Sequence, residues 1–341
     1  MIIQLAAAIL SFSHSPAAPA VRSQPDVQVQ VDSIRHEIVV TSGHIHIPGG
    51  VGYVHEHNET NVHFVWPAGG WARGYRIDIV DSLGRVLPRD LLHHAGIANL
   101  DRRTLPYPVA ERLLAAGRET PAMMLPASMG IPLSAGQHMV LYYMLVNPDS
   151  LPIEGAALRL TIAWTPDGER GPASVYPMFL DANPSSSGSR VFDLAPGRSV
   201  TSAEFTLPVG GHLRAVGGHV HDYAVELRLE DVESHRVLAR LRTTRDSAGH
   251  LLGVDTDRFL FRWHGLHLDA NHRYRVVSVY DNPTGETIHR GAMAFMVGPF
   301  TPDDASRWPP VDKCDPRYQE DYEGFDEPVA PPTHVHHPDR K

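Results

Sequence analysis

The sequence predicts an all-β protein made of antiparallel sandwiches, and three observations point to that fold class. The 341 residues include 28 glycines and 29 prolines, which favours short strands and tight turns over long helices. Several segments alternate between apolar and polar residues with a period of two, as half-buried strands do. Turn-forming residues separate these segments. We therefore expect two tandem β-sandwich domains.

Four segments carry the clearest alternation, and each is expected to form an antiparallel strand. Apolar side chains repeat at every second position in residues 74–80, 158–164 and 223–229, and in 274–280 with Ser278 as the one polar exception. Only one segment favours a helix: Pro108 to Gly117 is rich in residues that form helices well. The sequence thus predicts many strands and one short helix.

Composition shifts along the chain predict four regions. Residues 165–172 form a polar stretch containing Pro and Gly, so we expect one domain over 30–165 and a second over 166–300. Residues 1–20 combine a short apolar run with small residues at Ala18 and Ala20, a pattern typical of a signal peptide. Residues 301–341 are expected to be an extended, His-rich tail.

Charge and hydropathy narrow the classes of function. The formal net charge is −9, so the chain lacks the basic field that nucleic-acid binding requires. After the short apolar run at the start we find no stretch long enough to cross a bilayer, so we expect no integral membrane segment. Taken with the predicted signal peptide, this favours a secreted or periplasmic protein. The single cysteine, Cys314, excludes an intrachain disulfide.

Histidine is unusually abundant, with 22 copies, and one pair stands out. His219 and His221 flank Val220 directly before a predicted strand. Residues at positions i and i+2 of a strand face the same side, so both imidazoles can reach one metal ion. His212 lies seven residues earlier and is expected to support the site from its second shell.

A second pair, His93 and His94, is adjacent in sequence. Adjacent side chains of a regular strand point to opposite faces, so this pair can share an ion only at a strand end, a bulge or a twisted edge. Met293 and Met296 lie in a Gly- and Met-rich strand later in the chain. Thioethers are soft ligands, and their combination with imidazoles favours copper, although methionines are more often simply core residues.

Other histidines are better explained without a designed site. The stretch that holds His44, His46, His55, His57 and His63 contains loop-forming residues, so an exposed loop is the default interpretation. The tail histidines (His334, His336 and His337) lie in a Pro-rich segment where adventitious metal binding is expected. We find no motif typical of hydrolases or of nucleotide binding.

The sequence contains a His-His pair, then a His-x-His pair, then a Met-rich strand. In the order and spacing of these motifs it resembles the copper type II, ascorbate-dependent monooxygenases. That family includes peptidylglycine α-hydroxylating monooxygenase and dopamine β-monooxygenase, and this chain would be a divergent bacterial-type member. The resemblance implies two jelly-roll-like domains whose coppers sit on facing walls of a cleft. It also implies O2 and a small organic molecule as substrates, with ascorbate or another reductant as co-substrate.

The resemblance also assigns ligands. His219 and His221 match the imidazoles of the oxygen-binding copper, with Met293 as its thioether and Met296 as the alternative. His93 and His94 match two ligands of the electron-supplying copper. The strand that holds the family's third histidine contains none here, which leaves Met144 or His138 as the third ligand of that copper.

Three functions therefore stay open at this stage. The first is a copper-dependent monooxygenase that hydroxylates an unknown organic substrate. The second is a non-catalytic protein of the same fold that binds or buffers copper at one intact site. The third is a β-sandwich binding or structural protein whose histidines are incidental. The sequence identifies neither the substrate nor the oligomeric state.

Overall fold

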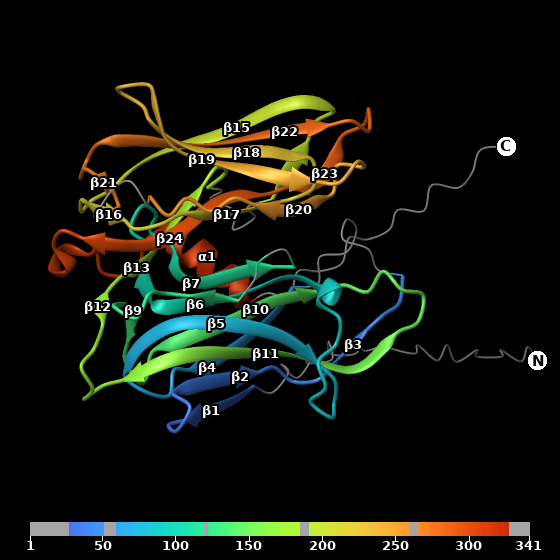
Figure 1. Cartoon of the computed structure of the whole chain (residues 1–341), viewed down its shortest axis with the longest axis vertical. Coiled ribbons are helices and arrows are strands. Elements are labelled where there is room, and N and C mark those ends of the chain that lie inside the picture. Colours follow the sequence, from blue (N-terminus) through green and yellow to red (C-terminus); the bar gives the residue numbers. More distant parts are fainter. Residues whose placement is uncertain are drawn as a thin grey trace, which may run out of the picture.

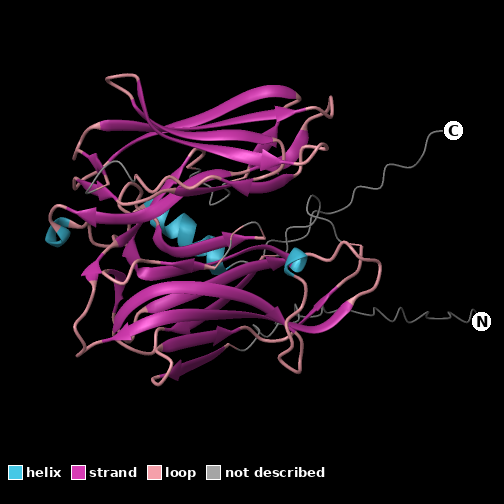
Figure 2. Ribbon diagram, viewed as in Figure 1, coloured by secondary structure: helices cyan, strands magenta, loops and turns pink. Residues whose placement is uncertain are grey.

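The computed structural model describes residues 27–50, 59–118, 120, 122–184, 191–259 and 265–326. These residues form two sandwich domains that pack against each other (Figures 1 and 2), and strands dominate both domains. The all-β, antiparallel fold class is confirmed. The predicted signal peptide, 1–20, lies outside the described residues. No helix among the described residues is long and apolar enough to cross a membrane.

The first domain consists of two sheets. The outer sheet runs in the order β1 (Gln28–Asp32), β2 (Glu37–Thr41), β11 (Ile153–Pro166), β5 (Gly70–Val80), β9 (Met129–Leu133) and β12 (Ala173–Ser174), with β3 (Ile45–Ile47) beside β11 and β8 (Met123–Met124) beside β5. The inner sheet runs in the order β4 (Thr60–Val65), β10 (His138–Leu145), β6 (Leu92–Arg103) and β7 (Ala110–Gly117). The short 3-10 helix η1 (Arg89–Leu91) leads into β6.

The second domain repeats this plan. Its inner sheet runs β13 (Tyr176–Asp181), β24 (Ala294–Pro302), β16 (Gly211–Leu213) and β21 (Leu266–Leu268), with β17 (Gly217–Val220) also on β24. Its outer sheet runs β15 (Gly197–Thr206), β22 (Arg273–Asn282), β18 (Ala224–Asp231), β19 (Arg236–Arg245) and β20 (Leu251–Val254), and β14 (Phe192–Leu194) pairs with β23 (Ile288–Ala292). The inner sheet of the second domain, β13-β24-β16-β21, has the same order as β2-β11-β5-β9 in the outer sheet of the first domain. The outer sheet of the second domain, β15-β22-β18-β19, has the same order as the inner sheet of the first, β4-β10-β6-β7. Both pairs of sheets follow the jelly-roll order.

Each domain buries its own core between its sheets. In the first domain the alternation expected over 74–80 and 158–164 places Ile77 and Leu160, among others, in one core cluster. In the second, Leu227 and Val276 belong to a separate cluster. The expected boundary at 165/166 falls at the end of β11, but β12 still pairs with β9 of the first domain, so the second domain begins with β13.

The helix expected over Pro108–Gly117 is wrong, because Ala110–Gly117 forms strand β7. Helix propensity is a weak preference that tertiary context overrides. Strand β7 pairs along β6, and both of its faces are covered, one by the core and the other by the helix α1 (Pro316–Asp326). Polar residues on β7 are buried with partners, as in the ion pair between Arg102 and Glu111.

We expected an extended tail after Phe300, but the segment is not extended throughout. It continues to the end of β24, forms a short 3-10 helix, η2 (Ala305–Arg307), and then forms α1. Tyr318 and Phe325 of α1 are buried against β6, β7 and β10. Asp315 accepts a hydrogen bond from the Arg317 backbone and Pro316 starts the helix, a residue pair that favours a helix N-terminus. The tail histidines lie outside the described residues.

Candidate metal site between the domains

A β-bulge at the start of β6 turns both His93 and His94 toward the second domain. In the pairing of β6 with β10, His94 lies opposite Met144 and Leu92 lies opposite Leu145, so His93 is the extra residue. Leu92 and Ala95 both belong to the core of the first domain. The bulge therefore places the two histidines between them on the other face, the condition under which an adjacent pair can share an ion.

The ring nitrogens of this pair are well placed for chelation. His93 Nδ1 and His94 Nδ1 lie 3.0 Å apart. Two nitrogens bound to one ion at about 2.0 Å would be separated by about 3 Å. The other nitrogen of His94, Nε2, lies 2.9 Å from the Glu59 carboxylate. Metal-binding histidines commonly hold such a carboxylate on their second nitrogen, which fixes the ring orientation.

Strand β17 presents His219 from the opposite side, and His221 follows directly after the end of this strand. The alternation predicted for this pair holds, because Val220 between them lies in the core of the second domain. The two imidazoles approach within 5.4 Å of each other, measured between ring centroids. The ring of Phe295, which lies opposite His219 on β24, packs on His219 at 5.2 Å.

The two pairs meet in one cavity between the inner sheets. The rings of His93 and His221, which come from different domains, are 5.7 Å apart between centroids and nearly perpendicular. A cavity of about 370 Å³ is lined by all four histidines, and we call it the interdomain cavity. Its other lining residues include Glu59, Arg112, Tyr142, Met144, Phe179, Arg290, Met293, Phe295, Asp321 and Phe325.

The structure separates the two methionine alternatives. Met293 lines the interdomain cavity, whereas Met296 is fully buried in the core of the second domain. On β24, Phe295 faces the cavity, so its neighbour Met296 must face the opposite side. Tyr280 holds the Met293 segment by donating a hydrogen bond to the Met293 carbonyl, and its hydroxyl accepts one from the His221 backbone. Burial raises the pKa of Tyr280, which keeps this donor protonated.

Met144 and His138 are also separated. Met144 lies opposite His94, and side chains directly opposite each other share a face, so Met144 faces the same cavity. His138 lies at the other end of β10, six residues and roughly 20 Å away at 3.3 Å per residue. There it contacts Asp101, with 3.0 Å between Nδ1 and Oδ2. His138 is therefore wrong as a third ligand.

The second-shell role expected for His212 is also wrong. His212 and His219 both sit on strands that pair with β24, opposite Thr301 and Phe295 respectively. These partners are six residues apart, or roughly 20 Å along the strand. His212 does not line the interdomain cavity and contacts His267 and Asp303 instead. The offset of seven residues misled because the chain continues along β24 between β16 and β17, with the Arg214 backbone N–H donating to the Pro299 carbonyl, so His212 and His219 lie far apart on one sheet.

Charged residues that the sequence did not single out border the cavity. Arg112 of β7 and Asp321 of α1 form a buried ion pair with two contacts between the guanidinium and the carboxylate. Burial opposes the charge on Arg112, but Asp321 outweighs it and raises the pKa of Arg112. Arg118 lies 3.6 Å from Asp222, which follows His221, and so links the two domains beside the cluster. None of these residues belongs to a local motif, because each contact joins distant segments.

Among the described residues, the other histidines that the sequence singled out, His44, His46 and His63, do not line the cavity. His46 contacts Glu154 on the surface of the first domain, with 2.7 Å between Nδ1 and Oε1. His63 lines a different hollow, which also includes His138 and Tyr318. His55 and His57 lie outside the described residues.

Comparisons with known proteins give no family for this chain. No protein-family model and no curated protein matches the sequence. Among solved structures, the STIV MCP crystal structure has 11% identity and a TM-score of 0.38, covering 86% of this chain and 99% of its own. A peptide-N(4)-(N-acetyl-β-D-glucosaminyl) asparagine amidase has 10% identity and a TM-score of 0.36, and the match covers 76% of this chain and 96% of the amidase chain. A chain from the structure of Sulfolobus Turreted Icosahedral Virus has 11% identity and a TM-score of 0.37, and the match covers 89% of this chain and 98% of the viral chain. The candidate site therefore rests on the geometry of this chain alone.

Proposed function

We propose that the protein binds copper in the interdomain cavity and uses it to oxidise a small organic molecule with O2 and an external reductant such as ascorbate. The observation that carries this proposal is the convergence of two histidine pairs, one from each domain, on a single cavity. The order of motifs that resembles the copper type II monooxygenases supports the same chemistry.

The donor set fits copper. His93 and His94 would hold one ion, with Met144 facing them across the pair of strands. His219 and His221 would hold another, with Met293, which lines the same cavity, as the thioether ligand. Imidazoles bind both oxidation states of copper, and thioethers favour Cu(I) over harder ions such as magnesium or calcium. Bound copper would supply the redox chemistry and the binding of O2.

The protein's own residues would position a substrate. Phe179, Phe295 and Phe325 contribute aromatic walls, and the cavity volume of about 370 Å³ suits a small organic molecule. The Arg112 guanidinium is already neutralised by Asp321, so it is not available as a single positive charge for an acidic substrate. The Glu59 carboxylate would orient the His94 ring by contacting the Nε2 atom of His94.

A second candidate is a non-catalytic protein that binds or buffers copper. Met144 favours it, because a thioether in place of the third histidine stabilises Cu(I) and would hinder the cycling that catalysis needs. The same cavity serves both functions, so copper binding alone cannot separate them. Ascorbate-dependent O2 consumption does.

The test compares wild-type protein with the double variant His219→Ala plus His221→Ala. Copper retained after removal of loosely bound metal should fall by at least half, and O2 consumption with ascorbate should be lost. The matched control is His44→Ala plus His46→Ala, which removes the same His-x-His pattern elsewhere in the chain and should change neither quantity. Copper binding without O2 consumption in wild-type protein would favour the buffering function. Unchanged copper content in the His219 and His221 variant would refute both.

A further inference from the structure

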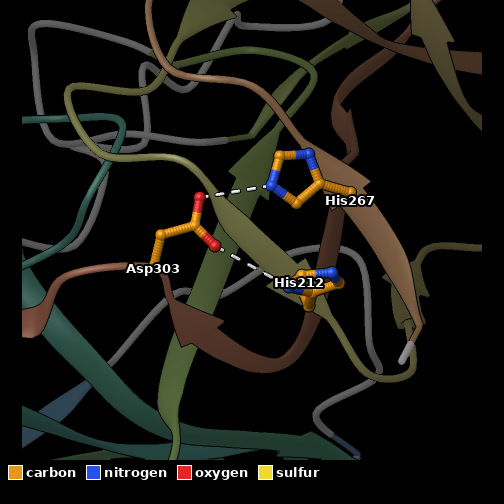
Figure 3. Close-up of side chains that lie close together, drawn as sticks. All are labelled: His212, His267 and Asp303. Atoms are coloured by element: carbon orange, nitrogen blue, oxygen red, sulfur yellow. Dashed lines mark hydrogen bonds and ion pairs between the residues drawn. The ribbon is translucent and has the colours of Figure 1, made fainter.

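A second cluster of metal-binding side chains lies at the edge of the second domain, away from the interdomain cavity. His212 of β16 pairs directly opposite His267 of β21, and Asp303 follows β24, the strand on the other side of β16. Figure 3 shows the Asp303 carboxylate beside the two imidazoles, with one oxygen directed at each ring. We call these three residues the edge triad.

The distances suit one bound ion. His267 Nε2 lies 3.2 Å from Asp303 Oδ2, and His212 Nδ1 lies 3.8 Å from Asp303 Oδ1. One ligand atom from each residue can be chosen so that all three lie within 4.8 Å of one another. Ligands about 2.0–2.1 Å from a tetrahedral ion are about 3.3 Å apart. Small side-chain rotations would therefore complete the coordination.

A carboxylate behind the triad supports this interpretation independently. Asp269 Oδ1 lies 3.3 Å from Nδ1 of His267, on the side of the ring away from Asp303. In this arrangement a carboxylate on the second ring nitrogen fixes the tautomer of a metal-binding histidine and raises its basicity. The Asp269 backbone is itself held, because its N–H donates to the Tyr274 hydroxyl at 2.7 Å.

The fold prepares the triad without a metal. His212 and His267 occupy paired positions of one sheet, and the Asp303 backbone N–H donates to the Gly210 carbonyl at 2.9 Å. The side chains of the three residues are 31%, 41% and 50% exposed for His212, His267 and Asp303 respectively. One side of a bound ion would therefore stay open to water or to a small ligand.

We propose that the edge triad binds a divalent transition-metal ion of the zinc and iron(II) class, with coordination positions left open. Two histidines and one carboxylate, with open positions, are the donor set that these ions take in many proteins. The site needs no contribution from the first domain and is independent of the function proposed for the interdomain cavity.

Another cluster, Asp231, Glu233 and His272, does not carry the same proposal. It offers one imidazole, and Glu233 is already paired with Arg273, with 3.0 Å between Oε1 and Nε. Asp231 accepts a hydrogen bond from the Ser234 backbone and contacts His272, and its pKa is lowered to about 2 by these partners. Its carboxylates are thus already engaged by neighbouring side chains and backbone groups.

Cobalt(II), a spectroscopic probe for zinc sites, tests the proposal in the full chain. The tail histidines are replaced by the substitutions His334→Ala, His336→Ala and His337→Ala to lower the background. In this background we expect visible absorption of bound cobalt, and Zn²⁺ should displace it. The variant His267→Ala should lose one equivalent of bound cobalt, and Asp269→Asn should weaken binding about tenfold.

The matched control is His289→Ala, which removes an exposed histidine that contacts a single carboxylate, Asp193, at 3.1 Å. It should leave the cobalt spectrum and stoichiometry unchanged. Circular dichroism checks that each variant is folded, and Asp303→Asn provides a second test that preserves side-chain shape. Equal cobalt binding by wild-type protein, His267→Ala and Asp303→Asn would overturn the proposal.

Discussion

The interdomain cavity and the edge triad are built in different ways. The cavity joins histidines from two domains, and its arrangement depends on a bulge in β6, on the helix α1 and on contacts across the interface. The edge triad comes from neighbouring strands of a single sheet. The comparison teaches that a cluster assembled between domains should be sensitive to distant changes, whereas a cluster held by one sheet should respond only to its own residues.

The two domains nevertheless place the cavity histidines at equivalent points. In each jelly roll the histidines lie where the third strand of the roll leads to the fourth. This is the start of β6 in the first domain and the end of β17, just before β18, in the second. The first domain uses a bulge to aim two adjacent residues, and the second uses the ordinary alternation of a strand.

The largest expected effect is that of Asp321→Ala. This change leaves the Arg112 guanidinium buried without its carboxylate and releases α1 from β7, so we expect a loss of about 3–5 kcal/mol in unfolding free energy. Copper binding in the cavity should weaken, and cobalt binding at the edge triad should persist wherever the variant is folded. Urea denaturation and metal titration measure both.

Asp315→Asn on the same helix is the control for that change. Asp315 forms an exposed ion pair with Arg317, and asparagine can still accept the helix-capping hydrogen bond. We expect less than about 1 kcal/mol of destabilisation. Similar losses in the two variants would show that α1 is not fixed by the buried pair.

Met144→Leu should produce the next largest effect, and it concerns copper alone. Leucine keeps the volume but removes the thioether opposite His94, so we expect Cu(I) affinity to fall about tenfold with less than about 1.5 kcal/mol of destabilisation. Competition with a chromogenic Cu(I) chelator measures the affinity. Met139→Leu changes a methionine on the same strand that faces the core, and it should leave Cu(I) affinity unchanged.

Tyr280→Phe should have a smaller effect. It removes the hydroxyl that connects the Met293 carbonyl with the His221 backbone, which should cost about 1 kcal/mol of stability and lower copper affinity severalfold. Tyr274→Phe removes the hydroxyl that holds Asp269 and should affect only the edge triad. If either variant altered both sites equally, the two clusters could not be independent.

The smallest expected effect is on the unfolding free energy and concerns buried tyrosines in both domains. It is negligible at neutral pH and measurable in alkali. Burial raises the pKa of Tyr274 and of Tyr318 from 10.0 to about 12. Because the folded pKa exceeds the unfolded value, the stability that each hydroxyl contributes is complete below about pH 10 and is lost as the pH rises toward 12. Unfolding measured from pH 9 to 12 should show this decline. The substitutions Tyr274→Phe and Tyr318→Phe should each reduce its slope, and an unchanged slope would contradict the assignment.

Periodicity and turn residues were enough to predict the fold class, because they depend on local pattern, whereas the grouping of the two histidine pairs came only from the resemblance to the copper monooxygenases. The alternation of His219, Val220 and His221 correctly placed the histidines opposite the core. The sequence could not predict β7, because its helix-forming residues become a strand only where β6 and α1 cover it. It also could not predict Glu59, Asp321 or the edge triad, because those contacts join segments far apart in the chain.

The most direct test of the central claim is a double-mutant cycle between His93→Ala and His221→Ala, measured as Cu(I) affinity of the full chain with the tail histidines replaced. These two rings come from different domains and lie 5.7 Å apart. If the two pairs hold neighbouring ions in one cavity, the loss of a ligand from one pair should change Cu(I) binding at the other, and the two effects should be coupled by about tenfold or more, or about 1.4 kcal/mol. Strictly additive effects would contradict a shared cavity for the two ions and leave two unrelated histidine pairs.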